Sequence, residues 1–223
     1  MTGHVAVIGA SRGLGLEFVR QYLADGFRVT ATARRDEDVD KLSALGATAF
    51  ALDVANAASV AGLSWQLDGA AFDVAVIVAG IYGPRTVGLE APTAEDFDAV
   101  MHTNVLGPMR VVQALADSLA PQARLALLSS RMASIGLRGS TYAWLYRASK
   151  AAANSVLKDA SVALSGRAVC VALHPGWVRT DMGGARADLT VEQSVASLRA
   201  TISRLTAADT GTFLNHDGQP LPW

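Results

Sequence analysis

The sequence predicts an α/β fold in which helices cover both faces of a parallel sheet of seven strands. Short apolar segments alternate with longer segments of helical period along the whole chain, and this order is typical of parallel sheets with right-handed crossovers. Apolar residues make up 51% of the chain and charged residues 17%, as expected for strands that are buried on both faces. The expected architecture is therefore doubly wound and Rossmann-type.

Each strand is predicted from a short run of mainly apolar residues. In chain order the strands are expected at residues 4–8, 27–33, 47–52, 73–79, 124–129, 168–173 and 212–215. The segments between them repeat apolar residues three or four positions apart, as one face of a helix does. The helices are expected at residues 14–25, 38–45, 59–67, 94–119, 144–165 and 191–205. No linker, repeat or low-complexity tract divides the 223 residues, so residues 1–223 are expected to form a single domain.

Charge and cysteine content narrow the choice of partners and compartment. Nineteen Lys and Arg residues oppose 20 Asp and Glu residues, a formal net charge of -1 without a basic block, so nucleic-acid and membrane binding are not expected. The apolar runs are also far shorter than the roughly 20 residues of a membrane-spanning helix. Cys170 is the only cysteine and the four histidines share no ligand spacing, so neither a disulfide nor a metal site is expected. We predict a cytoplasmic protein that binds a small molecule.

The connection between the first strand and the first helix is rich in glycine. Gly9, Gly13 and Gly15 follow the strand with the spacing GxxxGxG. Gly9 permits a sharp turn, bare backbone near Gly13 can approach a pyrophosphate at the helix N-terminus, and Gly15 lets the helix pack closely on the sheet. The pattern predicts a dinucleotide site, and an ordinary strand-to-helix turn is the simpler alternative. The other residues of this turn that would line the site are Ser11, Arg12 and Leu14.

The same turn also matches a nucleophile motif. Residues 9–13 read GxSxG, the serine elbow of α/β-hydrolases, with Ser11 as the nucleophile. Its partners would be His174 or His216 together with Asp181 or Asp217. No HGGG-type segment for oxyanion binding accompanies the motif. A hydrolase is therefore the weaker alternative.

The end of the second strand indicates which dinucleotide would bind. A carboxylate there binds the ribose 2′-hydroxyl of NAD(H), whereas an arginine accommodates the 2′-phosphate of NADP(H). Arg34 follows the predicted strand and Arg12 lies in the glycine turn, so two guanidinium groups could bind the phosphate. We therefore predict NADP(H). Asp36 would favour NAD(H) if the strand ran further, and otherwise it is a charge at the start of a helix.

A tyrosine and a lysine lie four residues apart near the start of one predicted helix. At this spacing Tyr146 and Lys150 project from the same face. A free tyrosine has a pKa near ~10, and an adjacent cation favours the phenolate and lowers that pKa. Tyr146 is therefore a candidate general acid/base. A surface pair is the simpler alternative.

Together these motifs resemble the short-chain dehydrogenase/reductase family along essentially the whole chain. The glycine turn resembles TGxxxGxG, residues 52–54 resemble the segment whose aspartate meets the adenine, and residues 146–150 resemble YxASK. Residues 174–180 resemble the family's Pro-Gly segment. Residues 129–135 and 173–184 are most similar to the C-factor/sniffer-type carbonyl reductases. The resemblance implies hydride transfer between a nicotinamide cofactor and a carbonyl or secondary alcohol, in a homodimer or homotetramer.

The resemblance also implies roles for individual residues. Ser130 would orient the substrate oxygen, Tyr146 would exchange a proton with it, Lys150 would bias the phenol and hold the nicotinamide ribose, and Asn104 would anchor a water molecule. The carboxamide of the nicotinamide would be held by Val178 and Thr180. The remaining residues implied in cofactor binding, besides Tyr146, Lys150, Arg34 and the glycine turn, are Asp53, Val54, Ala79, Gly80, Pro175 and Gly176.

Two features depart from the family pattern, and one functional alternative stays open. The family's NNAG reads IVAG at residues 77–80, which removes two asparagines near the cofactor. Ser130 lies further ahead of Tyr146 than is usual, which implies a longer loop, and Ser134 is the alternative serine. Tyr82, Trp144 and Trp177 are candidate substrate-side aromatics or core residues. Because fold does not imply function, an NADP(H)-binding regulatory or signalling protein on the same scaffold remains the second hypothesis.

Overall fold

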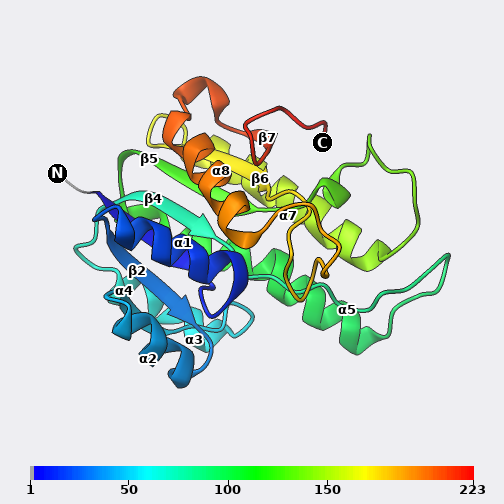
Figure 1. The fold of residues 1–223 in the computed structure, drawn as a ribbon, viewed down its shortest axis with the longest axis horizontal. Coiled ribbons are helices and arrows are strands. Elements are labelled where there is room, and N and C mark those ends of the chain that lie inside the picture. The colour runs from blue at the N-terminus through cyan, green and yellow to red at the C-terminus, as the bar shows by residue number, and fades with distance from the viewer. Residues whose placement is uncertain (1–2) are drawn as a thin grey trace.

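The computed structural model describes residues 3–223, and within them seven strands form one parallel sheet (Figure 1). The strands are β1 (His4–Ile8), β2 (Arg28–Ala33), β3 (Thr48–Ala51), β4 (Phe72–Ile77), β5 (Leu119–Leu128), β6 (Ala168–His174) and β7 (Thr212–Asn215). Their order is β3-β2-β1-β4-β5-β6-β7, which confirms the predicted doubly wound, Rossmann-type sheet. The winding reverses between β1 and β4, where such sheets form their ligand crevice at the strand carboxyl ends.

Helices cover both faces of this sheet. They are α1 (Gly13–Ala24), α2 (Asp36–Ala44), α3 (Ala57–Ala61), α4 (Leu63–Gln66), α5 (Ala94–Met101), α6 (Gly107–Leu115), α7 (Trp144–Ala163) and α8 (Val191–Arg204). Strand side chains alternate between the faces: Val5 and Val7 of β1 pack with α1, α2 and α8, whereas Ala6 and Ile8 pack with α3, α4, α6 and α7. Figure 1 shows α1 and α8 side by side on one face. Within residues 3–223 no helix has the length and apolarity to cross a membrane.

The predicted long helix at residues 94–119 is wrong in one respect, because the chain divides it. α5 ends at Met101, a π-helical turn spans His102–Leu106, α6 follows, and a 3-10 turn at Ala116–Ser118 leads into β5. β5 begins at Leu119, earlier than predicted, because Leu119 already pairs with Phe72 before a register irregularity. Apolar periodicity continues through all of these segments, so it could not show the divisions.

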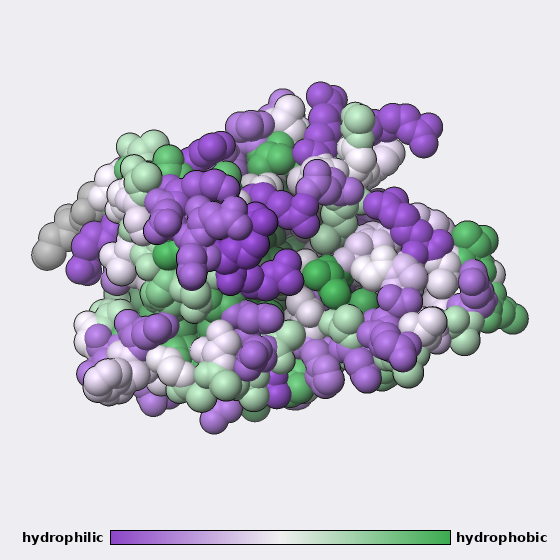
Figure 2. All heavy atoms as spheres, turned by 90° about the horizontal axis from the view of Figure 1, so that it is seen from below, coloured by the Kyte–Doolittle hydropathy of each residue, from purple (hydrophilic) through white to green (hydrophobic). Residues whose placement is uncertain are grey.

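The surface is mixed in character. Figure 2 shows one face of the molecule, with hydrophilic atoms over most of it and apolar atoms exposed in a hollow near its middle.

The last residues of the chain pack against the rest of the domain: the Trp223 ring stacks on Phe213 with centroids 5.7 Å apart. The Trp223 carbonyl also accepts hydrogen bonds from the backbone N–H groups of Ile135 and Gly136 at 3.0 and 3.2 Å. The chain end thereby fixes the loop that follows Ser130.

Candidate active site

Two cavities adjoin at the carboxyl ends of the central strands. The first, of about 460 Å³, is lined by the glycine turn and by Lys150, among others. The second, of about 790 Å³, lies between Ser130 and Trp177. The residues that line both are Leu14, Ser129, Tyr146, Pro175, Thr180 and Met182. A molecule in the first cavity therefore meets a molecule in the second beside the side chain of Tyr146.

The glycine turn shapes the first cavity as the sequence predicts. Gly9 has a φ of +91°, and a Cβ there would lie 2.8 Å from the Cα of Ala79. A side chain at this position would therefore collide with the backbone that follows β4. Gly13 has a φ of +53° and begins α1, and a Cβ there would make an ordinary contact with Thr180 Cγ2 at 3.7 Å. A Cβ on Gly15 would collide with the Gly9 carbonyl oxygen. Gly15 lines neither cavity, and its role is close packing of α1 on the sheet.

Arg34 and Arg12 are two of the arginines that line the first cavity. Arg34 lines it directly after the strand, whereas Asp36 does not and instead begins α2. Arg12 also lines the cavity, where its guanidinium forms an ion pair with Asp181. Both side chains of that pair are largely exposed, so the pair is weak and Arg12 can exchange Asp181 for another anion. The geometry therefore favours a phosphate over a hydroxyl partner at this end.

The segment after β4 is held without the two family asparagines. Val78 and Ala79 both donate their backbone N–H groups to the Ile8 carbonyl, at 2.9 and 3.0 Å. Asn104 lies buried in the π-helical turn, where its Oδ1 accepts from Ile81 N and its Nδ2 donates to Ile81 O, both at 2.8 Å. Asn104 lines neither cavity. It fixes the backbone that places Ala79 and Gly80 in the wall of the first cavity.

Tyr146 and Lys150 share a buried face of α7, but their electrostatics differ from our expectation. Burial raises the pKa of Tyr146 well above its ordinary value, and Tyr82 adds to this, while the neighbouring Ser130 hydroxyl opposes it. Lys150 lies 6.0 Å from the Tyr146 ring centroid and donates to the Leu128 carbonyl at 2.9 Å. Burial lowers the pKa of Lys150 to about 8. The expectation that Lys150 lowers the pKa of Tyr146 is therefore wrong here, because desolvation disfavours both charged forms.

Of the two candidate serines, only Ser130 faces the site. Ser130 lines the second cavity and interacts with Tyr146, and its Oγ accepts from Met132 N at 3.1 Å. Ser134 is fully buried and lines neither cavity. Its hydroxyl donates to the Trp223 carbonyl at 3.2 Å and accepts from Leu137 N at 3.1 Å. Ser134 therefore holds the loop against the chain end.

The second cavity contains two of the three candidate aromatic residues, Tyr82 and Trp177, and one residue that the sequence did not indicate, Met182. The Tyr82 ring stacks on the Tyr146 ring, with centroids 4.4 Å apart and an interplanar angle of 18°. The Tyr146 hydroxyl contacts Met182 Sδ at 3.9 Å. Trp177 lines the cavity and Trp144 does not. The position of Met182 over Tyr146, like the pairing of Arg12 with Asp181, arises from contacts between distant parts of the chain that no local pattern shows.

The other predicted cofactor residues divide between the cavities. Those lining the first, in addition to residues already described, are Ser11, Asp53, Val54, Pro175 and Thr180. Gly176 and Val178 line the second cavity and not the first. The hydrolase arrangement is not assembled: Ser11 lines the first cavity, His174 lines the second, and His216 is hydrogen-bonded to Ser197 at 2.9 Å. Among residues 3–223 no cluster of three or more His, Cys, Asp or Glu side chains could hold a metal ion.

Comparison with known proteins gives consistent matches over the whole chain. The family model of the short chain dehydrogenases matches residues 3–189. A 1-hydroxy-2-glutathionyl-2-methyl-3-butene dehydrogenase from Rhodococcus sp. (strain AD45) is 34% identical over 230 residues, which cover 98% of this chain and 99% of that protein.

Two solved structures are similar throughout. The carbonyl reductase Sniffer of D. melanogaster has a TM-score of 0.90 at 28% identity, and a carbonyl reductase from Pseudomonas aeruginosa PAO1 in complex with NADP has a TM-score of 0.89 at 34% identity. In both comparisons the match covers 100% of each chain.

Proposed function

Because the chain belongs to the short chain dehydrogenase family, we propose that it is an NADP(H)-dependent reductase acting on a carbonyl or secondary alcohol, with Tyr146 as general acid/base. The observation that carries the proposal is the meeting of two cavities at Tyr146, beside Ser130. One cavity suits a dinucleotide, and the other suits a substrate whose oxygen lies against these two hydroxyl groups.

The residues of the first cavity fit NADP(H), the cofactor of the Pseudomonas structure. The N-terminus of α1 and the glycine turn would bind the pyrophosphate, and Arg34 with Arg12 would bind the 2′-phosphate. Asp53 and Val54 would contact the adenine end, and Lys150 would hold the nicotinamide ribose. When bound, this cofactor supplies the hydride, and the protein contributes orientation and proton transfer.

Side chains of the second cavity would orient the substrate and transfer the proton. The Ser130 hydroxyl would donate a hydrogen bond to the substrate oxygen and orient it. Since burial raises the pKa of Tyr146, its phenol is protonated at neutral pH and can donate a proton to the developing alkoxide. Asn104, through Ile81, keeps the backbone beside this oxygen in place. The protonated phenol favours reduction of a carbonyl at neutral pH, and oxidation of an alcohol would require a higher pH.

A turnover screen tests this proposal. NADPH and NADH consumption would be measured in parallel with a panel of aldehydes, ketones and quinones. We expect steady turnover, with NADPH preferred, because Arg34 rather than Asp36 lines the cavity. Tight NADPH binding without consumption of any carbonyl would instead favour the regulatory or signalling alternative.

Assembly stays a prediction. The family resemblance predicts a homodimer or homotetramer of one dinucleotide-binding domain per chain. Apolar side chains on three helices, Phe97 of α5, Met109 of α6 and Val162 of α7, are exposed in the single chain. Light scattering of the purified protein would give the assembly size directly.

A further inference from the structure

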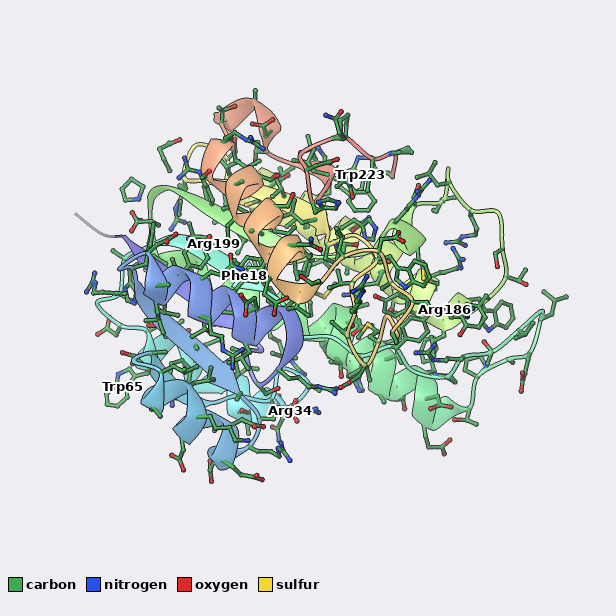
Figure 3. All side chains as sticks on the ribbon, in the orientation of Figure 1. Phe18, Arg34, Trp65, Arg186, Arg199 and Trp223 are labelled. Atoms are coloured by element: carbon green, nitrogen blue, oxygen red, sulfur yellow. The ribbon has the colours of Figure 1, made fainter. Side chains whose placement is uncertain are left out.

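We propose that the second cavity selects carbonyl substrates that carry a carboxylate, bound by arginines around its wall; this inference rests on the proposed reductase function. The charged side chains that line this cavity are Arg85, Arg131 and Arg186, and no Asp or Glu of the described chain lines it. In Figure 3 Arg34 and Arg186 lie well apart. The positive charge of the second cavity is thus separate from the arginine expected at the cofactor's 2′-phosphate.

The three arginines are not neutralised by carboxylates. None of them forms an ion pair among residues 3–223, in contrast to Arg12 with Asp181 in the first cavity. Arg85 contacts only neutral groups: it donates to the Met182 carbonyl at 3.1 Å and to the Tyr142 hydroxyl at 3.5 Å. A planar guanidinium group is well suited to bidentate binding of a carboxylate.

The other titratable groups of this cavity add no compensating charge. Tyr82 and Tyr146 line it, and burial raises the pKa of both, so each phenol is neutral at pH 7. Burial lowers the pKa of His174 to about 4, with contributions from His216 and Arg131, so His174 is also neutral. The arginines therefore set the sign of the potential that a substrate meets, and a concave site strengthens such a field.

Two of the arginines, Arg131 and Arg85, are linked to the residues at the expected reacting position. Arg131 directly follows Ser130 in the chain, and Arg85 lies 4.9 Å from the centroid of Tyr82, whose ring stacks on Tyr146. A carbonyl placed at Ser130 and Tyr146 would have its far end near these guanidinium groups. The aromatic walls formed by Tyr82, Tyr142 and Trp177 suit a flat apolar body between the two ends. The geometry thus fits an aromatic aldehyde or ketone that bears a carboxylate.

Three benzaldehydes that differ in charge at the para position test this specificity. The carboxylate, its neutral methyl ester and the trimethylammonium compound would each be reduced with NADPH, and kcat/KM measured. We expect the carboxylate to be preferred over the ester by about tenfold or more, since one tenfold step corresponds to a single charge-assisted contact. The ester and the ammonium group withdraw electrons more strongly, so a preference for the carboxylate has to come from binding. Equal rates, or preference for the ester or ammonium compound, would overturn the proposal.

Arginine variants show which side chains produce the preference for the carboxylate. Arg131→Gln and Arg186→Gln should each lower the carboxylate-to-ester ratio severalfold, and added salt should lower it in the wild type. Arg138→Gln is the matched control, because Arg138 is an exposed arginine of the same loop as Arg131 and lines neither cavity; its ratio should equal that of the wild type. Unchanged ratios in both cavity variants would refute the role of these arginines.

A binding measurement separates this inference from the proposed function. If neither the three aldehydes nor any other carbonyl of the turnover screen is reduced, the reductase proposal fails. Calorimetry with para-carboxybenzyl alcohol and benzyl alcohol, with and without NADP+, still tests the anion site in that case. Binding of the carboxylate at least about tenfold tighter than binding of benzyl alcohol, weakened by Arg131→Gln, would support it. The absence of this difference would overturn it.

Discussion

The buried ammonium group of Lys150 should destabilise the folded protein, so Lys150→Met should stabilise it. Lys150 is 5% exposed, and burial lowers its pKa from 10.5 to about 8. Each tenfold change in the proton equilibrium is worth about 1.4 kcal/mol, so keeping the charge at neutral pH costs the folded state about 3 kcal/mol. Methionine fills a similar volume but leaves the Leu128 carbonyl without its 2.9 Å hydrogen bond, which costs about 1 kcal/mol. The expected net gain is about 2 kcal/mol.

The pH dependence of this gain identifies its cause. Between pH 8 and 10.5 the unfolded chain holds a proton on Lys150 that the folded chain has released, so the stability of the wild type rises with pH through this window. The variant lacks this group, and contributions of Tyr146 and the other titratable groups cancel in the comparison. Urea denaturation of both proteins without cofactor should therefore show the variant more stable by about 2 kcal/mol below pH 8, and this difference should shrink as the pH rises. Near pH 10.5 its sign should be reversed, with the wild type more stable by about 1 kcal/mol, because only the lost hydrogen bond to the Leu128 carbonyl then remains.

The same substitution should abolish most carbonyl reduction, since Lys150 is proposed to hold the ribose. A variant that is more stable but less active is the expected pattern when a functional group destabilises the folded protein. A variant less stable than the wild type at pH 7, or a difference in stability that is constant with pH, would refute the assignment of a desolvated ammonium at this position.

Three further predictions follow from the geometry, two of them with a matched control substitution. Arg34→Ala should weaken NADPH binding by about 10- to 100-fold and leave NADH binding nearly unchanged. Arg35→Ala should leave the binding of both cofactors nearly unchanged, because the Arg35 guanidinium is already paired with two carboxylates of α2; fluorescence titration measures the dissociation constants. Ser130→Ala should lower kcat/KM by about a hundredfold, while Ser134→Ala should keep it and lose about 1 kcal/mol of unfolding free energy; the opposite pattern would make Ser134 the reacting serine. Gly15→Ala should destabilise the protein by about 2 kcal/mol or more in urea melts, because its Cβ meets the Gly9 carbonyl, and a wild-type melt would contradict that packing.

The sequence predicts the sheet well because each strand is a local apolar run. β1 and β7 have the predicted bounds, and glycine spacing correctly places the turn against the first cavity. The helical period, by contrast, could not show the π-helical turn at His102–Leu106. That turn depends on which backbone groups find partners in three dimensions, and apolar spacing is nearly the same in a continuous helix.

The candidate site was predictable where one motif carries the residue, and not where two distant segments meet. Tyr146 and Lys150 lie on one buried face because their spacing requires it. The ion pair of Arg12 with Asp181 joins residues 169 positions apart. Burial, which raises the pKa of Tyr146, is likewise a property of the packed molecule. The arginines of the second cavity come from three separate connections, and only the fold brings them to one wall.

The central claim is that Tyr146 delivers the proton to a carbonyl reduced with NADPH. The most direct test is the rate of NADPH consumption with para-carboxybenzaldehyde for the wild type and for Tyr146→Phe, together with the dissociation constant of NADPH for each. We predict that the variant binds NADPH within about threefold of the wild type and loses at least about a hundredfold in kcat. A variant that binds NADPH normally and turns over near the wild-type rate would contradict the account.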